Sequence, residues 1–159
     1  MVDESAESSA GSRRTEGSDD HPLTILVVHE IEADAEALAA LLAIRTPANV
    51  SWMTPPLRGA FRADVILVSW RCYRGDLVDE LGASATCVYG VEEQASAIVA
   101  CLRSGAVACA TASCTADDLI DVLQRAGRGS YALSDTAVRL LAQIARAQNR
   151  RGEHDEDRQ

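Results

Sequence analysis

The sequence predicts an α/β protein with a doubly wound, five-stranded parallel sheet and one extra helix at its C-terminal end. Five short apolar segments alternate along the chain with segments in which apolar residues recur at helical spacing. Two of the apolar segments, LTILVV and DVILVS, are continuous rather than alternating, which is typical of parallel strands covered by helices on both faces. In such a sheet, functional sites lie at the carboxyl ends of the strands.

The predicted strands are four to six residues long, and most contain the β-branched side chains that suit a buried pleated surface. They cover residues 23–28, 50–54, 64–69, 86–89 and 107–111. Residues 55–62 are expected to form a short helical or irregular link between the second and third strands.

The predicted helices carry apolar residues at three- and four-residue spacing, and the first helix has acidic residues in its opening turns. They cover residues 32–45, 76–81, 92–104, 116–126 and 135–148, with the weakest pattern at 76–81. Thr115, with Asp118 three residues later, resembles a capping box, and Ser134 is expected to cap the last helix. Gly105 and Gly127 are expected to end the helices that precede them.

The composition divides the chain into one domain with polar ends. Residues 1–21 contain Ser, Gly and acidic residues with almost nothing to bury, so we expect a disordered tail. Residues 22–132 carry the sheet, residues 133–148 form a C-terminal linker helix, and residues 149–159 form a flexible polar tail or the start of an interdomain linker. A chain of 159 residues can bury one core without disulfides or a structural metal.

The charged residues exclude several kinds of chemistry. The chain has 24 acidic residues against 15 basic ones, all of them arginine, and a net charge of −9. Without lysine there is no amine for a Schiff base and no P-loop lysine for a nucleotide phosphate. An acidic surface repels a phosphate backbone, so we expect no direct nucleic-acid binding by this chain.

The cysteines and the hydropathy pattern predict a cytoplasmic protein without membrane contact. The five cysteines form no C-x-x-C pair and are odd in number, which fits reduced thiols better than a disulfide framework or a zinc ribbon. Cys72 and Cys114 lie in predicted loops and are the candidates for a thiol sensor, although ordinary packing is the simpler interpretation. No apolar run approaches the roughly 20 residues of a membrane span, and the acidic N-terminus is unlike a signal peptide.

Five segments, in order, resemble the receiver domain of bacterial two-component response regulators of the LuxR/NarL type. Residues 25–30, ILVVHE, resemble that family's opening ILVVDDE, and residues 63–70, ADVILVSW, resemble its PDVVLLDL. The other three segments are residues 102–108, LRSGAVA, similar to its LRAGARG; residues 115–119, similar to the start of its fifth helix; and residues 128–141, RGSYALSDTAVRLL, similar to the segment before its linker helix. The resemblance covers roughly residues 23–145 and implies a receiver/flavodoxin-like fold with a role in signalling.

The chain departs from this family at the residues that carry its chemistry. A receiver takes phosphate on an aspartate after the third strand, holds Mg²⁺ with an acidic pair after the first strand, and uses a lysine after the fifth. Here these places hold Ser69, His29 with Glu30, and Ala112, while Gly90 stands at the Thr/Ser switch position. We therefore expect an atypical receiver that is not regulated by aspartyl phosphorylation and has no cofactor and no metal.

The altered pocket is a candidate ligand site. Arg71, Tyr73 and Arg74 follow Ser69 and could hold an anion or a small ligand over it; the alternative is that they are solvated loop side chains. His29 could be a pH-sensitive or metal-binding group; the alternative is a single structural histidine, because metal-binding partners are not evident in the sequence. No G-x-S-x-G motif surrounds Ser69, so we predict no catalytic residue.

The last helix is expected to form a homodimer interface. Val138, Leu141 and Ile144 lie along one stripe of it, and five strands normally need only five covering helices. The resembled family also commonly makes dimer contacts at this end of the fold.

The predicted function is that of a non-enzymatic, phosphorylation-independent signalling module of a transcription regulator. It would act by homodimerisation and by binding a protein partner or a small-molecule effector, with DNA contacted only by a helix-turn-helix that this sequence lacks. Two alternatives stay open: a stand-alone protein–protein interaction module, and, least favoured, a small hydrolase or phosphotransfer protein using Ser69, His29 and Glu30.

Overall fold

The computed structural model describes residues 21–57, 62–73 and 85–156, the last four by their backbone alone. The predicted helix over 76–81 and nearly all of the predicted N-terminal tail lie outside these residues. No helix in the described part of the chain has both the length and the hydropathy that a membrane span requires.

Parallel strands form one sheet in the order β2-β1-β3-β4-β5-β6, which confirms the predicted fold class. The strands are β1 (Thr24–Val28), β2 (Asn49–Met53), β3 (Val65–Ser69), β4 (Ala85–Val91), β5 (Ala108–Thr111) and β6 (Ala132–Leu133). β1 and β3 are central and apolar along nearly their whole length, as expected for strands covered on both faces.

The sheet has one strand more than predicted. β6 is only two residues long, too short to show a hydrophobic period in the sequence. It is held by long-range backbone contacts: the Ala132 N–H donates to the Val107 carbonyl and the Ser134 N–H donates to the Cys109 carbonyl, each at 3.0 Å. β6 thereby fixes the point at the sheet edge from which the last helix starts.

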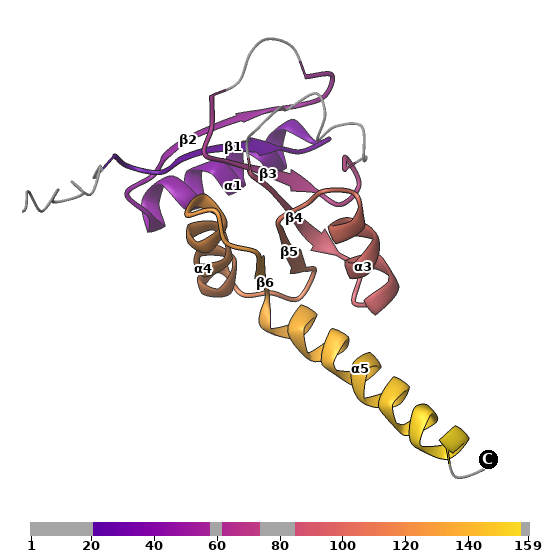
Figure 1. Cartoon of the computed structure of the whole chain (residues 1–159). Coiled ribbons are helices and arrows are strands. Elements are labelled where there is room, and N and C mark those ends of the chain that lie inside the picture. The colour runs from indigo at the N-terminus through magenta and orange to yellow at the C-terminus, as the bar shows by residue number, and fades with distance from the viewer. Residues whose placement is uncertain (1–20, 58–61, 74–84, 157–159) are drawn as a thin grey trace, which may run out of the picture.

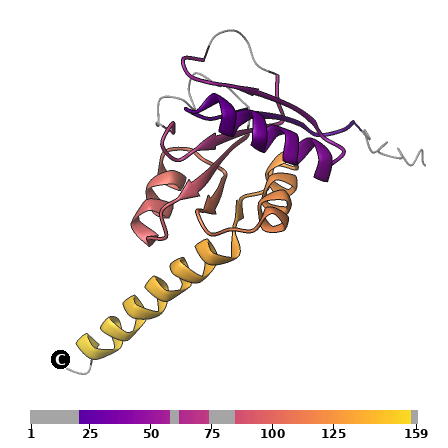
Figure 2. The ribbon, with the colours of Figure 1, turned by 180° about the vertical axis from the view of Figure 1, so that it is seen from behind.

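Helices cover both faces of the sheet (Figures 1 and 2). They are α1 (Glu32–Arg45), α3 (Ala95–Arg103), α4 (Ala116–Gly127) and α5 (Asp135–Glu156). α1 and α4 share one core cluster, in which Leu42 and Leu123 are fully buried. α3 and the first turns of α5 share the other, around Ile98 and Ala137.

Between β2 and β3 the described residues, 54–57 and 62–64, contain no helix, so this part of the predicted link is irregular.

At α4 the predicted cap is confirmed, since the Asp118 N–H donates to Thr115 Oγ1 at 3.1 Å.

The prediction that the Ser134 side chain caps α5 is wrong. Its hydroxyl is fully buried and accepts the N–H of Thr111 at 3.1 Å, which ties α5 to β5. The N–H of Asp135 donates instead to Asp118 Oδ2 of α4 at 3.2 Å.

α5 continues beyond its predicted end near residue 148 and reaches Glu156. Residues 149–156 contain no proline to stop it. Figures 1 and 2 show α5 projecting away from the sheet, and every residue from 143 to 152 is exposed.

Candidate functional site at the carboxyl ends of β1, β3 and β4

Three neighbouring strands bring most of the predicted site residues together. His29 and Glu30 follow β1, Ser69 ends β3 and Gly90 lies near the end of β4. Because the strands are parallel and adjacent in the order β1-β3-β4, these ends meet at one edge of the sheet. The residues line a cavity of about 240 Å³: His29, Glu30, Ile31, Asp34, Ser69, Trp70, Arg71, Tyr89 and Gly90.

Ser69 and Glu30 form the centre of this site. The Ser69 side chain is buried, and its hydroxyl donates to Glu30 Oε2 at 2.6 Å. The Cys72 thiol lies 3.2 Å from the same carboxylate oxygen, and the Cys72 N–H donates to Ser69 Oγ at 3.3 Å. The loop after β3 therefore folds back so that the serine hydroxyl has partners on both sides.

This arrangement favours the ionised form of Glu30. Desolvation opposes ionisation, but the hydrogen bonds from Ser69, from the Glu30 backbone and from Cys72 outweigh it and, with His29, lower the pKa of Glu30 to about 2. A carboxylate with so low a pKa is a weak general base. It stabilises the Ser69 hydroxyl in place without activating it as a nucleophile.

His29 contacts Glu30 and Asp34 rather than Ser69. Its Nδ1 accepts the Ile31 N–H at 2.9 Å and lies 3.5 Å from Glu30 Oε2, and its Nε2 lies 3.9 Å from Asp34 Oδ2. No hydrogen bond joins His29 to Ser69 among the described residues, so they form no nucleophile and base pair. The same part of the chain contains no group of three His, Cys, Asp or Glu side chains that could hold a metal ion.

Tyr89 and Gly90 shape the β4 side of the cavity. Gly90 has a φ of 70° at the point where the β4–β5 register shifts, a conformation that favours glycine. The Tyr89 hydroxyl is buried and has no hydrogen-bond partner among the described residues. Burial, followed by the charge of Glu30, raises its pKa.

Two predicted neighbours of the pocket lie elsewhere. Ala112 is exposed after β5 and does not line the cavity, although its N–H donates to the Val91 carbonyl at 2.9 Å. Tyr73 packs on the α3 side of the sheet, with its hydroxyl 3.5 Å from the Cys101 carbonyl, and so does not cover Ser69. Arg71 does line the cavity, and Arg74 is outside the described residues.

Asp34, Cys72 and Tyr89 are site neighbours that sequence reasoning did not place there. The sequence contains a weak signal for Asp34, which lies in the first turn of α1, shortly after His29 and Glu30. The contact of Cys72 depends on the fold of the loop after β3, which has no local pattern.

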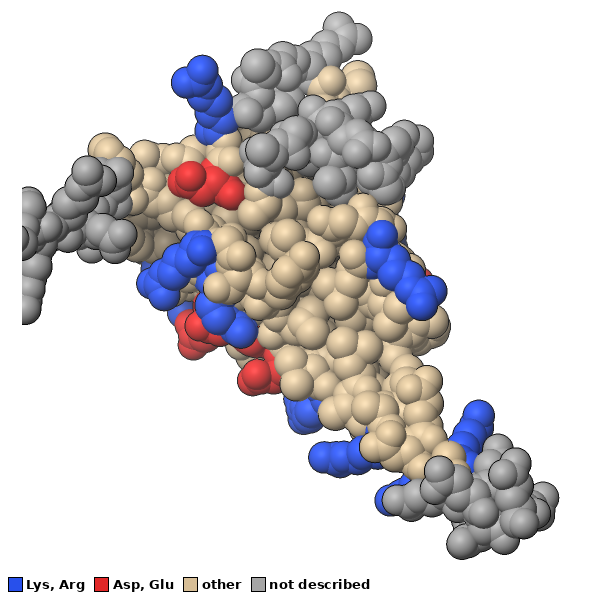
Figure 3. All heavy atoms as spheres, viewed as in Figure 1, with Lys and Arg blue, Asp and Glu red and all other residues tan. Residues whose placement is uncertain are grey.

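The predicted dimer stripe on α5 is partly exposed. Val138 and Ile144 are 50% and 40% exposed, whereas Leu141 is half-buried and packs against the core cluster beneath α3. Arg139, Arg146 and Arg150 follow one another at spacings of seven and four, which places them on a different side of the helix from Ile144. Arginines along one edge of α5 are visible in Figure 3.

Comparison with known proteins identifies the fold. No protein-family model matches the sequence, and no curated protein matches it. Among solved structures, a LuxR-family two-component response regulator from Aurantimonas sp. SI85-9A1 is 13% identical with a TM-score of 0.67, over 79% of this chain and 99% of that one.

Two further solved structures have the same fold as this chain. The isolated receiver domain of RcsB from Salmonella enterica serovar Typhimurium, in the presence of the phosphomimetic BeF₃⁻, is 12% identical with a TM-score of 0.60, over 76% of this chain and 99% of that one. RcsB in a structure of two dimers bound to two parallel DNAs is 11% identical with a TM-score of 0.63, over 79% of this chain and 70% of that one. The chain therefore has the parallel α/β fold of response-regulator receiver domains.

Proposed function

We propose that this chain is a receiver-like signalling module of a transcription regulator that works without aspartyl phosphorylation. In this proposal it acts in the cytoplasm, as a homodimer, and responds to a protein partner or a small-molecule effector. DNA is contacted by a helix-turn-helix outside this sequence. The fold supports the signalling role, and the RcsB dimers bound to DNA are a precedent on a similar fold.

The observation that carries the proposal is the buried Ser69 hydroxyl, which donates to Glu30 at 2.6 Å. Ser69 stands where the resembled family has its phosphate-accepting aspartate. A serine hydroxyl cannot form an acyl phosphate, and the pKa of about 2 leaves Glu30 too weak a base to activate it. Glu30 is also the one carboxylate where the family has an acidic pair, and no lysine exists to pair with a phosphate.

The same geometry argues against the hydrolase alternative. The base nearest to Ser69 is Glu30, and His29 uses Nδ1 to accept a backbone N–H. A nucleophilic serine needs a base of matched pKa that is itself oriented by a third group.

The test is sedimentation velocity with intact mass spectrometry, on the full chain with and without acetyl phosphate plus Mg²⁺ and, separately, beryllofluoride. We expect a dimer whose sedimentation is unchanged and a chain mass without added phosphate. Ser69→Asp is the matched variant, since it restores the missing carboxylate at the same position. Phosphate on the unaltered chain, or a monomer that dimerises only with these reagents, would contradict the proposal.

A stand-alone interaction module would give the same sedimentation and the same intact mass in this test. The reading frame that encodes the chain separates the two. A helix-turn-helix encoded directly after these residues would support the transcription regulator, and a frame without one would support the stand-alone module.

A further inference from the structure

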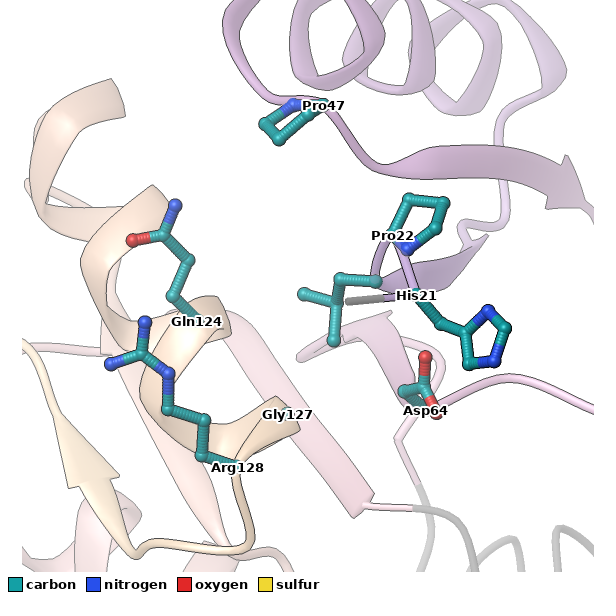
Figure 4. Close-up of a pocket in the computed structure, with 8 residues that line it drawn as sticks. His21, Pro22, Pro47, Asp64, Gln124, Gly127 and Arg128 are labelled. Carbon is teal, nitrogen blue, oxygen red and sulfur yellow. The ribbon is translucent and has the colours of Figure 1, made fainter. Parts of the chain in front are cut away.

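A second cavity, of about 780 Å³, lies at the amino ends of the strands, where β1 and β3 begin, opposite the site around Ser69. It is lined by residues from the chain before β1, the α1–β2 loop, the residue before β3 and the end of α4: His21, Pro22, Leu23, Pro47, Asp64, Gln124, Gly127 and Arg128. Figure 4 shows Gln124 and Arg128 on one wall and Pro22, Pro47, His21 and Asp64 on the other. The volume lies within the range of small-molecule sites.

We propose that this cavity binds a small organic monocarboxylate. Arg128 and Gln124 hold the carboxylate, and the apolar part of the ligand lies against Leu23, Pro22 and Pro47. The proposal is independent of the function proposed above, because it uses none of the residues around Ser69.

The α4 wall supplies the donors. Gln124 and Arg128 are four residues apart at the end of α4, so their side chains project from the same side of the helix. Arg125 pairs with Asp121, and Arg45 pairs with Asp117, but Arg128 is exposed and has no ion pair among the described residues. A planar guanidinium beside an amide is suited to bidentate recognition of a carboxylate.

The opposite wall carries a negative charge that disfavours a second carboxylate on the ligand. Asp64 Oδ2 accepts the Thr24 N–H at 2.8 Å, so its negative charge is held at that wall. A second carboxylate at the far end of a ligand would lie near Asp64 and be repelled, whereas an apolar end would not. The charges of the two walls therefore set the orientation of the ligand.

The apolar surface of this cavity depends on a close contact between Leu23 and Gly127. A Cβ added to Gly127 would lie 2.3 Å from Leu23 Cδ1, so the absence of a side chain at Gly127 lets Leu23 lie directly against α4. A smaller adjoining cavity of about 50 Å³ shares Leu23, Pro47 and Gln124 and adds apolar side chains, among them Ile120 and Leu123. An apolar chain thus has a surface that leads from the donors toward the core.

The experiment is an NMR titration of the full chain with octanoate, followed at the Gly127 and Gly129 amides and the Gln124 side-chain amide. Suberate, with a second carboxylate, and octylamine, with the opposite charge, are the comparison probes. We expect saturable shifts with octanoate, weaker binding of suberate and no saturable binding of octylamine.

Arg128→Gln should weaken octanoate binding roughly tenfold, the size expected for losing one charge-assisted hydrogen bond. Arg103→Gln is the matched control, since Arg103 is an exposed arginine in the last turn of α3. Gly127→Ala, which displaces Leu23, should also weaken binding while the helix is retained. No saturable shift at these amides, equal affinity in Arg128→Gln, or octylamine binding as tight as octanoate would overturn the proposal.

Discussion

At the scale of single residues, the pair of Ser69 and Glu30 distinguishes this chain from the receivers that it resembles. Replacing a carboxylate by a hydroxyl removes a negative charge next to Glu30 and supplies a hydrogen-bond donor to it. Both changes favour the ionised form of Glu30 and help to hold its pKa low. The Ser69 hydroxyl and the Glu30 carboxylate thus satisfy each other within the pocket.

Ser69→Ala should raise the pKa of Glu30 from about 2 toward its ordinary value of 4.5, because the largest of the contributions that lower it is removed. A folded-state pKa below the unfolded one stabilises the fold above pH 4.5, and this contribution is lost as the pH falls toward 2. Ser69→Ala should therefore lose less stability than the unaltered chain as the pH falls from 4.5 to about 2. Carboxyl ¹³C titration measures the pKa, and Ser104→Ala, an exposed serine on the α3 side, should leave it unchanged. A Glu30 pKa still near 2 in Ser69→Ala would show that the other hydrogen bonds to Glu30 keep its pKa low without Ser69.

At the scale of elements, the attachment of α5 to the sheet depends on two side-chain contacts. Ser134 Oγ accepts the Thr111 N–H, and Asp118 accepts the Asp135 N–H, so β5 and α4 both hold the start of α5. The first helical bond, from the Val138 N–H to the Ser134 carbonyl at 3.0 Å, begins directly after these contacts. The direction in which α5 leaves the domain is thereby fixed by residues of the core.

Ser134→Ala should lower the free energy of unfolding by about 1–3 kcal/mol, because it leaves the buried Thr111 N–H without its acceptor. Urea unfolding followed by circular dichroism measures this change. Ser130→Ala, at an exposed serine four residues earlier, should alter the free energy by no more than about 0.5 kcal/mol. Equal effects of the two substitutions would mean that the Thr111 N–H finds another partner.

At the scale of the whole molecule, the projecting part of α5 is the feature that most needs a partner. Residues 143–152 are all exposed, and a helix of this length without tertiary contacts is marginal in water. The exposed Val138 and Ile144 extend the apolar side that Ala137 and Leu141 begin inside the domain. A second copy of α5 on this side would explain both the exposed apolar residues and the length of the helix.

Ile144→Arg should convert the proposed dimer to a monomer, because it places a charge on the exposed apolar side of α5 that forms the proposed interface. Sedimentation velocity over a range of concentrations measures the change. The matched control is Ile44→Arg, an isoleucine of α1 that is 82% exposed, and it should leave the dimer intact. Leu141→Arg is a less specific test, because Leu141 also packs against the core. A dimer that persists in Ile144→Arg would place the interface elsewhere.

The fold class, the bounds of α1, the apolar strands β1 and β3, and the cap of α4 could all be predicted from the sequence. These features depend on hydrophobic period and capping, which act within a few residues along the chain. Topology then explains why His29, Glu30, Ser69 and Gly90 meet, since the carboxyl ends of adjacent parallel strands share one edge.

Which of these residues are in contact, and whether Glu30 is ionised, depends on the tertiary structure. The bond between Ser69 and Glu30 spans 39 residues and the contact of Cys72 with Glu30 spans 42, so neither leaves a local pattern. The same holds for β6, for the hydrogen bond from the Thr111 N–H of β5 to the Ser134 hydroxyl, for the direction of Tyr73 and for the cavity beside Arg128. Each of them depends on side chains and backbone groups from distant segments, whose partners are set by how the helices pack on the sheet.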